Sequence, residues 1–309
     1  MSQPLHAVTP LWRSEPLAEA LGAEVLLKMD CLQQVGSFKI RGLGRMCQVE
    51  VERGASRIVS SSGGNAGYAI AWACRALGVP TTVVVPRTTS EFMRAKIRAV
   101  GAEVREHGDA WDDAHAHAVQ LAADGNGTYV HPFDHPAVWD GHASVIEEAA
   151  AQGAKPGVVV VAVGGGGLLC GILEGMHRVG WQDVPVLAVE TEGAASFHAA
   201  AQAGRLVTLD AIRSVATTLG ARTVTPQLLE WQKRHEILHW IATDRQAVDA
   251  CLRFLDDHRM LVEPACGAAL AAVYERCDVL RGPAPVLVEV CGGAGVSLEL
   301  LQRWDREVG

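Results

Sequence analysis

Short, continuously apolar segments alternate with segments of helical periodicity along most of the 309-residue chain. Clear apolar examples are "TTVVVP" (81–86), "GVVVVAVG" (157–164) and "PVLVEVCG" (285–292). Runs of this kind are typical of parallel strands that are covered on both faces. Because strands alternating with helices form doubly wound sheets, the pattern predicts an α/β fold.

The same pattern locates the other elements. We expect further strands at 24–30, 57–62, 102–107, 128–133 and 184–190. Helical spacing of apolar residues is found at 66–77, 88–100, 109–123, 168–179, 225–234, 244–258 and 265–280. The length suggests two lobes, although no linker composition marks a boundary between them.

Composition restricts the classes of function. The formal net charge is −8 and no basic run is present, which disfavours nucleic acid or an anionic membrane as a partner. The first residues lack the features of a secretory signal, and no stretch is apolar enough to span a bilayer. The eight cysteines form no CxxC pair, and scattered thiols suit a reducing cytoplasm. We therefore expect a cytoplasmic protein.

Two glycine-rich turns each stand between an expected strand and an expected helix, "SSGGNAG" (61–67) and "GGGGLLCG" (164–171). Free backbone N–H groups and the positive end of the helix dipole make such turns anion sites. One such turn is as often only a tight connection, but two together favour a phosphate and a carboxylate as ligands. Neither turn is a P-loop, because no GK[ST] follows.

A dinucleotide fingerprint is incomplete in the second turn, since Leu169 or Cys170 holds the place of its third glycine. Glu190, however, ends the next expected strand, about where an acid that binds a ribose would stand. A nicotinamide-dependent oxidoreductase therefore remains an alternative.

Lys39 stands between Phe38 and Ile40 in "QQVGSFKIRG" (33–42). A lone lysine is usually a solvated surface residue, but burial lowers the pKa of the amine and frees its lone pair for imine formation. A reactive amine, a phosphate turn and a carboxylate turn correspond to the groups of pyridoxal phosphate joined to an amino acid. Cys291, after the last apolar strand, could hydrogen-bond the pyridine nitrogen or be a packing residue. A thiol there would not protonate the ring, which favours elimination over transamination.

Taken in order, "GSFKIRG", "SSGGNAG", "GGGGLLCG" and "EVCGG" resemble motifs of the fold-type II pyridoxal-phosphate enzymes. "HPFDHPAVWDGHAS" (131–144), "VETEGAASFHAA" (189–200) and "LVEPACGAALAAVY" (261–274) narrow the resemblance to the short catabolic L-serine/L-threonine dehydratases, or ammonia-lyases, and to their serine dehydratase-like branch. The resemblance extends from about residue 5 to about residue 300.

The resemblance implies a fold like that of the tryptophan synthase β subunit, with two lobes, each a mainly parallel sheet flanked by helices. The large, cofactor-binding domain would comprise residues 1–39 and 137–309, and the small domain residues 40–136. The resemblance also implies a homodimer that takes a small amino acid as its substrate.

Roles in the family can be assigned by position. Lys39 matches the Schiff-base lysine, and Phe38 the residue on the pyridine face. Other residues that match cofactor contacts are Asn65 at the 3′-oxygen, Gly164, Gly165, Gly166, Gly167 and Leu168 at the phosphate, and Cys291 at the pyridine nitrogen. The substrate carboxylate would lie at Ser62, Gly63, Gly64, Asn65 and Ala66. A monovalent cation, potassium, would be held by Gly164, Glu190, Ala194 and Ser196, which competes with the ribose role of Glu190.

The activity that the resemblance implies is β-elimination through an aminoacrylate. L-Serine would give pyruvate and ammonia, and L-threonine would give 2-oxobutanoate and ammonia. β-Replacement, as in cysteine synthases, is chemically close and stays an alternative, and so does a non-catalytic sensor. Gly63 stands where some dehydratases carry alanine and serine racemases carry serine. We therefore expect no racemase activity, and a looser fit of the substrate.

Histidines are the remaining candidates for chemistry. His115 and His117 fall on a polar helix with two aspartates, and we expect them to face solvent. His131, His135 and His142 flank a loop rich in proline and aspartate, but they lack a recognisable spacing for metal ligands.

Overall fold

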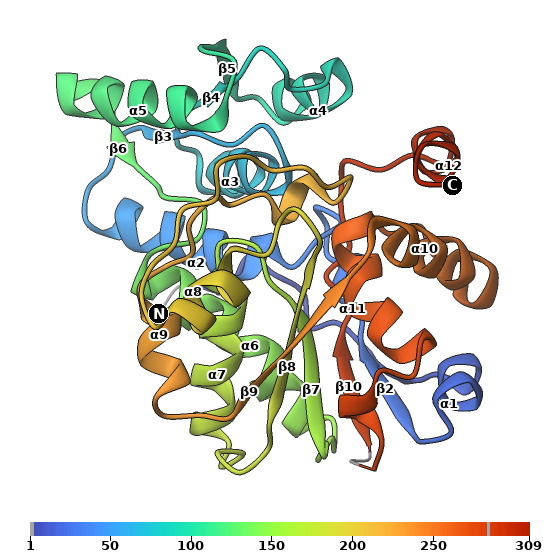
Figure 1. Ribbon diagram of the computed structural model, residues 1–309. Helices are drawn as coiled ribbons and strands as arrows, with labels where there is room; N and C mark the ends of the chain where they lie inside the picture. Colours follow the sequence, from blue (N-terminus) through green and yellow to red (C-terminus); the bar gives the residue numbers. More distant parts are fainter. Residues whose placement is uncertain (1–2, 283–284) are drawn as a thin grey trace.

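The computed structural model describes residues 3–282 and 285–309, and these residues form two sheets (Figure 1). The larger sheet has six strands in the order β1-β2-β10-β7-β8-β9, and the smaller has four in the order β5-β4-β3-β6. All neighbouring strands run parallel except β1 and β2. The expected α/β fold with mainly parallel sheets is confirmed.

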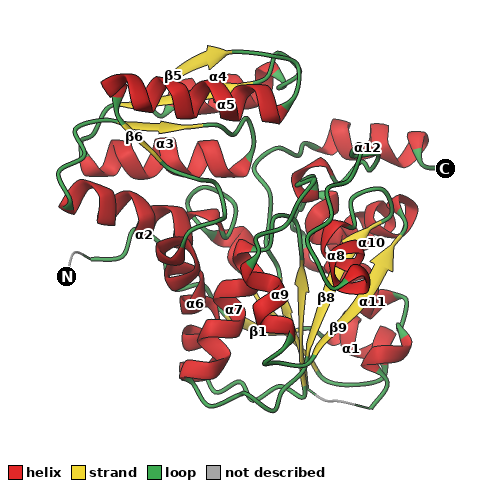
Figure 2. Ribbon diagram, turned by 60° about the vertical axis from the view of Figure 1, so that its left-hand side comes forward, coloured by secondary structure: helices red, strands yellow, loops and turns green. Residues whose placement is uncertain are grey.

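The strands are β1 Leu11–Arg13, β2 Val25–Lys28, β3 Ile58–Ser60, β4 Thr81–Val85, β5 Glu103–Glu106, β6 Thr128–Tyr129, β7 Val158–Ala162, β8 Val186–Thr191, β9 Ile237–Ala242 and β10 Val286–Glu289. The α-helices are α1 Glu15–Leu21, α2 Lys39–Glu52, α3 Asn65–Leu77, α4 Glu91–Ala99, α5 Trp111–Leu121, α6 Pro136–Ala151, α7 Gly167–Arg178, α8 Ser196–Ala203, α9 Gln227–Gln232, α10 Asp244–His258, α11 Pro264–Tyr274 and α12 Leu298–Glu307. Figure 2 shows α3, α4 and α5 beside the smaller sheet.

Each of the eight expected strands is present, although β6 is shorter than the expected 128–133. Two strands, β1 and β9, and five helices, α1, α2, α6, α8 and α12, were not expected. The helix expected at 265–280 is wrong in length: α11 ends at Tyr274, and Arg276 has a φ of 52° that interrupts the helix. The predicted division into domains of 1–39 with 137–309 and 40–136 stays a prediction.

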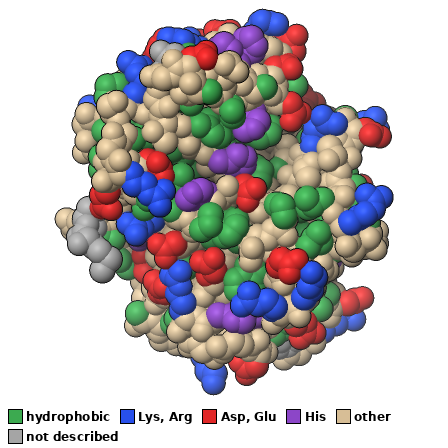
Figure 3. All heavy atoms as spheres, turned by 90° about the vertical axis from the view of Figure 1, so that its left-hand side faces the viewer, with side chains coloured by type: hydrophobic (Ala, Val, Ile, Leu, Met, Phe, Trp, Pro, Cys, Tyr) green, Lys and Arg blue, Asp and Glu red, His purple; other side chains and the backbone are tan. Residues whose placement is uncertain are grey.

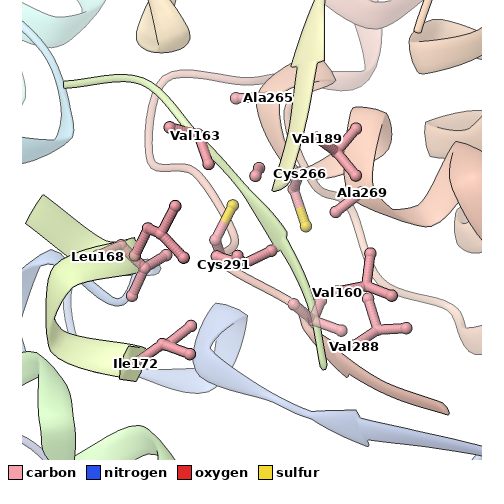
Figure 4. Packing of buried hydrophobic residues seen from close by; sticks show 14 of the residues in the cluster. Val160, Val163, Leu168, Ile172, Val189, Ala265, Cys266, Ala269, Val288 and Cys291 are labelled. Atoms are coloured by element: carbon pink, nitrogen blue, oxygen red, sulfur yellow. The ribbon is translucent and has the colours of Figure 1, made fainter. Parts of the chain in front are cut away.

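The main hydrophobic core surrounds the central strands of the larger sheet. Every residue of β7 and β8 is buried, as their continuously apolar sequences predict. Figure 4 shows Leu168 and Ile172 of α7 on one side of this region, and Cys266 and Ala269 of α11 on the other. Helix α11 is apolar on all sides and buried along its 11 residues, which is how such a helix is usually found.

The ends of the parallel strands determine where a ligand could be held. β10, β7 and β8 are neighbours and run in the same direction, so the segments that follow them meet at one edge of the sheet. These segments begin near Cys291, Gly164 and Glu190, which were all predicted as site residues. In open α/β sheets this edge is the usual place for a ligand.

Within residues 3–282 and 285–309, no helix is long and apolar enough to cross a membrane. All eight cysteines are free thiols, in agreement with their scattered positions in the sequence.

Candidate cofactor and substrate site

Lys39 is the first residue of α2, and the chain before it is fixed against the segment that follows β10. The backbone N–H of Phe38 donates a hydrogen bond to the carbonyl of Cys291 (3.1 Å), and Ser37 forms an isolated antiparallel bridge with Gly292. The amine nitrogen of Lys39 lies 4.9 Å from the centre of the Phe38 ring. The segment before Lys39 is thus held against residues 291–292, which lie near the other end of the sequence.

Burial lowers the pKa of the Lys39 amine to about 8. The carboxylate of nearby Glu263 acts in the opposite direction, because a negative charge favours the protonated amine. The position at a helix N-terminus further disfavours a positive charge. Compared with an ordinary lysine, a much larger fraction of this amine is neutral near pH 7, as a nucleophilic amine requires.

Glu263 is a residue of this site that the sequence analysis did not identify. Its carboxylate accepts hydrogen bonds from the Asn65 side-chain amide (2.6 Å) and from the Thr218 hydroxyl (2.6 Å). Burial raises the pKa of Glu263 to about 7. The carbonyl of Asn65 accepts a hydrogen bond from the N–H of Ala294 (2.7 Å), so both ends of its amide are held. The second amide N–H of Asn65 has no acceptor among the described residues and is available for a ligand.

The glycines after Cys291 allow two close approaches. A Cβ atom at Gly292, which has a φ of 84°, would lie 2.3 Å from the carbonyl oxygen of Gly36. A Cβ atom at Gly293 would lie 2.2 Å from the carboxyl carbon of Glu263. Side chains at these positions would therefore displace the segment before Lys39 or the carboxylate that holds Asn65.

Cys291 is buried beside Cys266 in the apolar cluster of Figure 4. A hydrogen bond with Cys266, together with burial, raises the pKa of the Cys291 thiol well above its ordinary value. Cys291 therefore stays a neutral thiol at physiological pH. Its position at the end of a central strand suits either packing or a contact to a bound ring, and both interpretations from the sequence remain open.

The turn 164–167 lies between β7 and α7 and presents free donors. None of the described residues accepts a hydrogen bond from the backbone N–H groups of Gly165, Gly166, Gly167 or Leu168. Gly166 has a φ of 92° and precedes the helix. A Cβ atom at Gly165 would lie 2.6 Å from the ring of Phe133, so this ring packs directly on the turn. Free N–H groups at a helix N-terminus form an anion site.

The turn 61–64 leads from β3 into α3. Gly63 does not leave an open space, because a Cβ atom there would lie 2.3 Å from the hydroxyl oxygen of Thr89. The space that an alanine methyl group would occupy at position 63 is therefore filled by the side chain of Thr89. Sequence motifs gave no signal for this contact, which joins residues of two different loops.

A series of contacts connects the two glycine-rich turns. A Cβ atom at Gly164 would lie 3.3 Å from the carbonyl of Thr218, and the Thr218 hydroxyl binds Glu263. Glu263 in turn binds Asn65, at the start of α3. The structure thus brings the turn 164–167, the turn 61–64 and Lys39 around the buried carboxylate of Glu263.

Glu190 is the last residue but one of β8 and is fully buried. Its two carboxylate oxygens accept hydrogen bonds from the N–H groups of Phe197 and His198 (both 2.8 Å), and burial raises its pKa to about 7. The hydroxyl of Ser196 is buried with no hydrogen-bond partner among the described residues. Glu190 therefore caps α8 and does not reach into the crevice as a ribose-binding acid would.

The expectation that His115 faces solvent is wrong. Its Nδ1 atom lies 2.7 Å from the Tyr129 hydroxyl and 3.4 Å from the Ser61 hydroxyl. His117 stacks on His107 with the ring centres 4.1 Å apart. Figure 3 shows several histidine side chains on one face of the molecule. Periodicity alone misses these contacts because they come from other elements.

Two of the three histidines near the loop 131–144, His131 and His135, are explained by local contacts, whereas both ring nitrogens of His142 are buried without a hydrogen-bond partner among the described residues. Nδ1 of His131 accepts hydrogen bonds from the N–H groups of Phe133 and Asp134, and burial lowers the pKa of His131 to about 4. His135 caps the start of α6 through the N–H of Ala137. In the part of the chain that the structure describes, no group of three or more His, Cys, Asp or Glu side chains could hold a metal ion.

Comparisons with known proteins show similarity over nearly the whole chain. The serine dehydratase-like protein of Mus musculus is 48% identical over 317 residues, which cover 100% of this chain and 96% of the relative. The L-serine dehydratase/L-threonine deaminase of Homo sapiens is 47% identical over 99% of this chain and 97% of its own. The crystal structure of an L-serine ammonia-lyase from Rhizomucor miehei superimposes with a TM-score of 0.95 at 37% identity, covering 99% of this chain and 100% of that structure.

The family model described as "Pyridoxal-phosphate dependent enzyme" matches residues 3–292, which is nearly the whole chain. This match and the similarity to the dehydratases confirm the resemblance inferred from the motifs. The chain belongs to the pyridoxal-phosphate dependent enzymes of fold type II.

Proposed function

We propose that this chain is an ammonia-lyase that converts L-serine to pyruvate and ammonia, and L-threonine to 2-oxobutanoate and ammonia. The activities for which the mammalian relatives and the fungal enzyme are named support these substrates. The observation that carries the proposal is the Lys39 amine, whose pKa of about 8 makes it available as a nucleophile and as a base.

The residues of the site fit pyridoxal phosphate. The N–H groups at the turn 164–167 would hold the phosphate, and the free amide N–H of Asn65 would hold the 3′-oxygen. The ring would pack on Phe38, with its nitrogen at the Cys291 thiol. When bound, the cofactor supplies an electron sink for the bonds at the α-carbon of the substrate.

The protein itself would bind the substrate and move its protons. The N–H groups of the turn Ser62–Ala66, at the start of α3, suit the substrate carboxylate. The Lys39 amine would hold the cofactor as its covalent attachment point and, when free, would take the proton from the α-carbon of the substrate. Because Cys291 stays a neutral thiol, it does not protonate the pyridine nitrogen, and this favours loss of the β-hydroxyl over transfer of the amine.

We also propose a potassium ion at Gly164, Glu190, Ala194 and Ser196. Two observations support it: the Ser196 hydroxyl is buried without a partner among the described residues, and the N–H of Val163 binds the carbonyl of Val189 (2.8 Å), which sets Gly164 beside Glu190. Oxygen ligands suit such a hard cation. Replacement of potassium by choline in the buffer is expected to lower activity, and unchanged activity would contradict this part of the proposal.

The proposed function is tested with the purified holoenzyme. We expect a visible absorbance band that changes on addition of L-serine or L-threonine, with release of keto acid. Lys39→Ala should abolish both the band and the turnover, whereas Lys155→Ala, at an exposed position, should change neither. If Lys39→Ala retains both, the assignment of Lys39 is wrong.

The remaining alternative is β-replacement. A band that changes with substrate, without keto acid but with cysteine formed when sulfide is added, would favour it over elimination.

We further propose a homodimer in the cytoplasm, with the large and small domains that the resemblance implies. Light scattering coupled to size exclusion tests the dimer.

A further inference from the structure

Ser61 precedes the turn that we assign to the substrate carboxylate, and it contacts side chains of helix α5 and strand β6. The indole N–H of Trp111 donates a hydrogen bond to the Ser61 carbonyl. The Ser61 hydroxyl lies 2.8 Å from the Tyr129 hydroxyl, which lies 2.7 Å from Nδ1 of His115. Ser61 is fully buried, so its hydroxyl has few alternatives to these contacts.

Ring contacts connect His115 with the turn 164–167, which we assign to the cofactor phosphate. The rings of His115 and His131 are 5.7 Å apart, and those of His131 and Phe133 are 4.6 Å apart. Phe133 packs on Gly165 of the phosphate turn. Burial is the main cause of the lowered pKa of His131, and the charge of Lys39 adds to the lowering.

The direction of the hydrogen bonds depends on the protonation of His115. When Nδ1 of His115 is unprotonated it accepts from Tyr129, and Tyr129 can then accept from Ser61. When His115 is protonated, its Nδ1–H donates to Tyr129, and the Tyr129 hydroxyl is turned to donate to Ser61. The hydroxyl proton of Ser61 must then find another acceptor in or near the turn 61–64.

We propose that Trp111, His115 and Tyr129 are positioning residues for the substrate-carboxylate turn, and that Tyr129 transmits the protonation state of His115 to Ser61. The proposal rests on the assignment of Ser62–Ala66 to the substrate carboxylate. It gives α5 a role in the affinity for the amino acid, without any contact between α5 and the substrate.

The groups around His115 determine the pH range in which its ring becomes protonated. Burial lowers the pKa of His115 below 6.5, whereas the carboxylate of Asp112 acts to raise it. Asp112 is also bound by the guanidinium group of Arg222 (3.2 Å). The ring of Trp111 stacks on His115 with centres 4.8 Å apart, and His131 faces it at a right angle. His115 is therefore mainly neutral at pH 7, and it becomes protonated only at a pH below the ordinary value of a histidine.

The test uses Tyr129→Phe, which keeps the ring and removes the hydroxyl that contacts both His115 and Ser61. Only the longer direct contact of 3.4 Å between Nδ1 of His115 and the Ser61 hydroxyl then remains. For the holoenzyme at pH 7, we expect the KM for L-serine to rise about fivefold, the effect of one lost hydrogen bond, with kcat and the cofactor band unchanged. Wild type should also show a change in KM below pH 6.5 that the variant lacks. Tyr274→Phe is the matched control, since its hydroxyl binds Asp257 in another part of the protein.

If Tyr129→Phe does not fold, Ser61→Ala serves as the second variant. It removes the Ser61 hydroxyl that contacts Tyr129, and it should abolish the pH dependence of KM in the same way. An unchanged KM, or the same pH dependence in wild type and both variants, overturns the proposal. Wild type that forms no keto acid from L-serine contradicts the proposed function instead. In that case the Kd for L-serine, from the change in cofactor absorbance, replaces KM in the same comparison and decides the positioning role.

Discussion

The guanidinium group of Arg41 and the carboxylate of Asp30 form a two-point ion pair that has no exposure to solvent. The distances are 2.6 Å from Nε to Oδ2 and 2.7 Å from Nη2 to Oδ1. Arg41 also binds both carboxylate oxygens of Glu148 in α6 (2.7 and 2.8 Å). Because Arg41 follows Lys39 by two residues, these ion pairs anchor the helix turn that carries the Lys39 amine.

Arg41→Met is expected to destabilise the fold strongly, since it leaves the carboxylate of Asp30 buried without its partner. Removing one member of a buried ion pair typically costs about 3–5 kcal/mol of unfolding free energy. Urea unfolding followed by circular dichroism measures the loss. Arg53→Met is the matched control, because Arg53 directly follows the same helix and pairs with Glu50 through an exposed side chain. Equal effects of the two substitutions would contradict the anchoring role.

Glu148 should make stability depend on acid pH. Burial alone would raise its pKa, but hydrogen bonds from His6 and Arg41, and an ion pair with Lys28, hold the pKa well below the ordinary 4.5. The stability that it contributes is therefore complete above about pH 4.5 and is lost as the pH falls below that value. Glu148→Gln should lower the Tm at pH 6 and flatten its fall between pH 5 and pH 3. Glu147→Gln, on the same helix but exposed, should retain the steep fall.

The lowered pKa of Lys39 has a kinetic consequence. The rate at which the apoenzyme takes up pyridoxal phosphate should rise with pH and level off above about pH 8, because only the neutral amine reacts. An ordinary lysine would give a rise that continues towards pH 10.5. Growth of the visible band after mixing measures the rate. A rise that continues beyond pH 9.5 would show that the amine is not desolvated in solution.

Glu263→Gln tests the charge beside that amine. The carboxylate of Glu263 raises the pKa of Lys39, so its neutral replacement should move the midpoint of cofactor uptake below pH 8. Glutamine keeps an acceptor for Asn65 and Thr218, so the effect of charge is separated from the effect of the hydrogen bonds. Glu174→Gln, a half-buried carboxylate on α7, should leave the midpoint unchanged. A shift to higher pH would contradict the assigned interaction.

Much of the sheet could be predicted because its central strands are buried on both faces and thus read as unbroken apolar runs, as in 158–162 and 186–191. Strand β9 was not predicted because it is an edge strand that is half-exposed along most of its length. His239 interrupts its apolar residues, so the sequence shows no continuous apolar run there. Helix α2 escaped because glycines and charges at its start resemble a loop. Its pairing with α3 and α6 comes from tertiary contacts, not from periodicity.

Motifs identified the residues of the site that are local in sequence, Lys39 and the two glycine-rich turns. They could not identify Glu263, because its hydrogen bond to Asn65 joins residues 198 positions apart. Tyr129 was missed for a similar reason, since its contact with Ser61 spans two strands of the smaller sheet. The sequence contains the groups that perform chemistry, but the side chains that orient them become visible only in the folded chain.

Thr89 occupies the space beside Gly63, and this contact allows a test of whether the two residues act as a unit. A Cβ atom at Gly63 would lie 2.3 Å from Oγ1 and 2.6 Å from Cγ2 of Thr89. Because threonine is branched at Cβ and restricted at χ1, it has little freedom to move aside. Gly63→Ala alone is therefore expected to cost about 1–3 kcal/mol through overpacking, and to lower kcat/KM for L-serine.

Thr89→Ala should relieve most of that cost, because only its Cβ atom, 3.0 Å from the new methyl group, remains. The four proteins of the Gly63→Ala and Thr89→Ala cycle are compared by urea unfolding and by kcat/KM, and we expect a favourable coupling of about 1 kcal/mol or more in stability. Thr88→Ala, at the exposed neighbouring position, is the control and should combine additively with Gly63→Ala. Additive behaviour in the Thr89 cycle as well would mean that the turn moves to accept the methyl group, and that Thr89 does not determine the space beside the substrate.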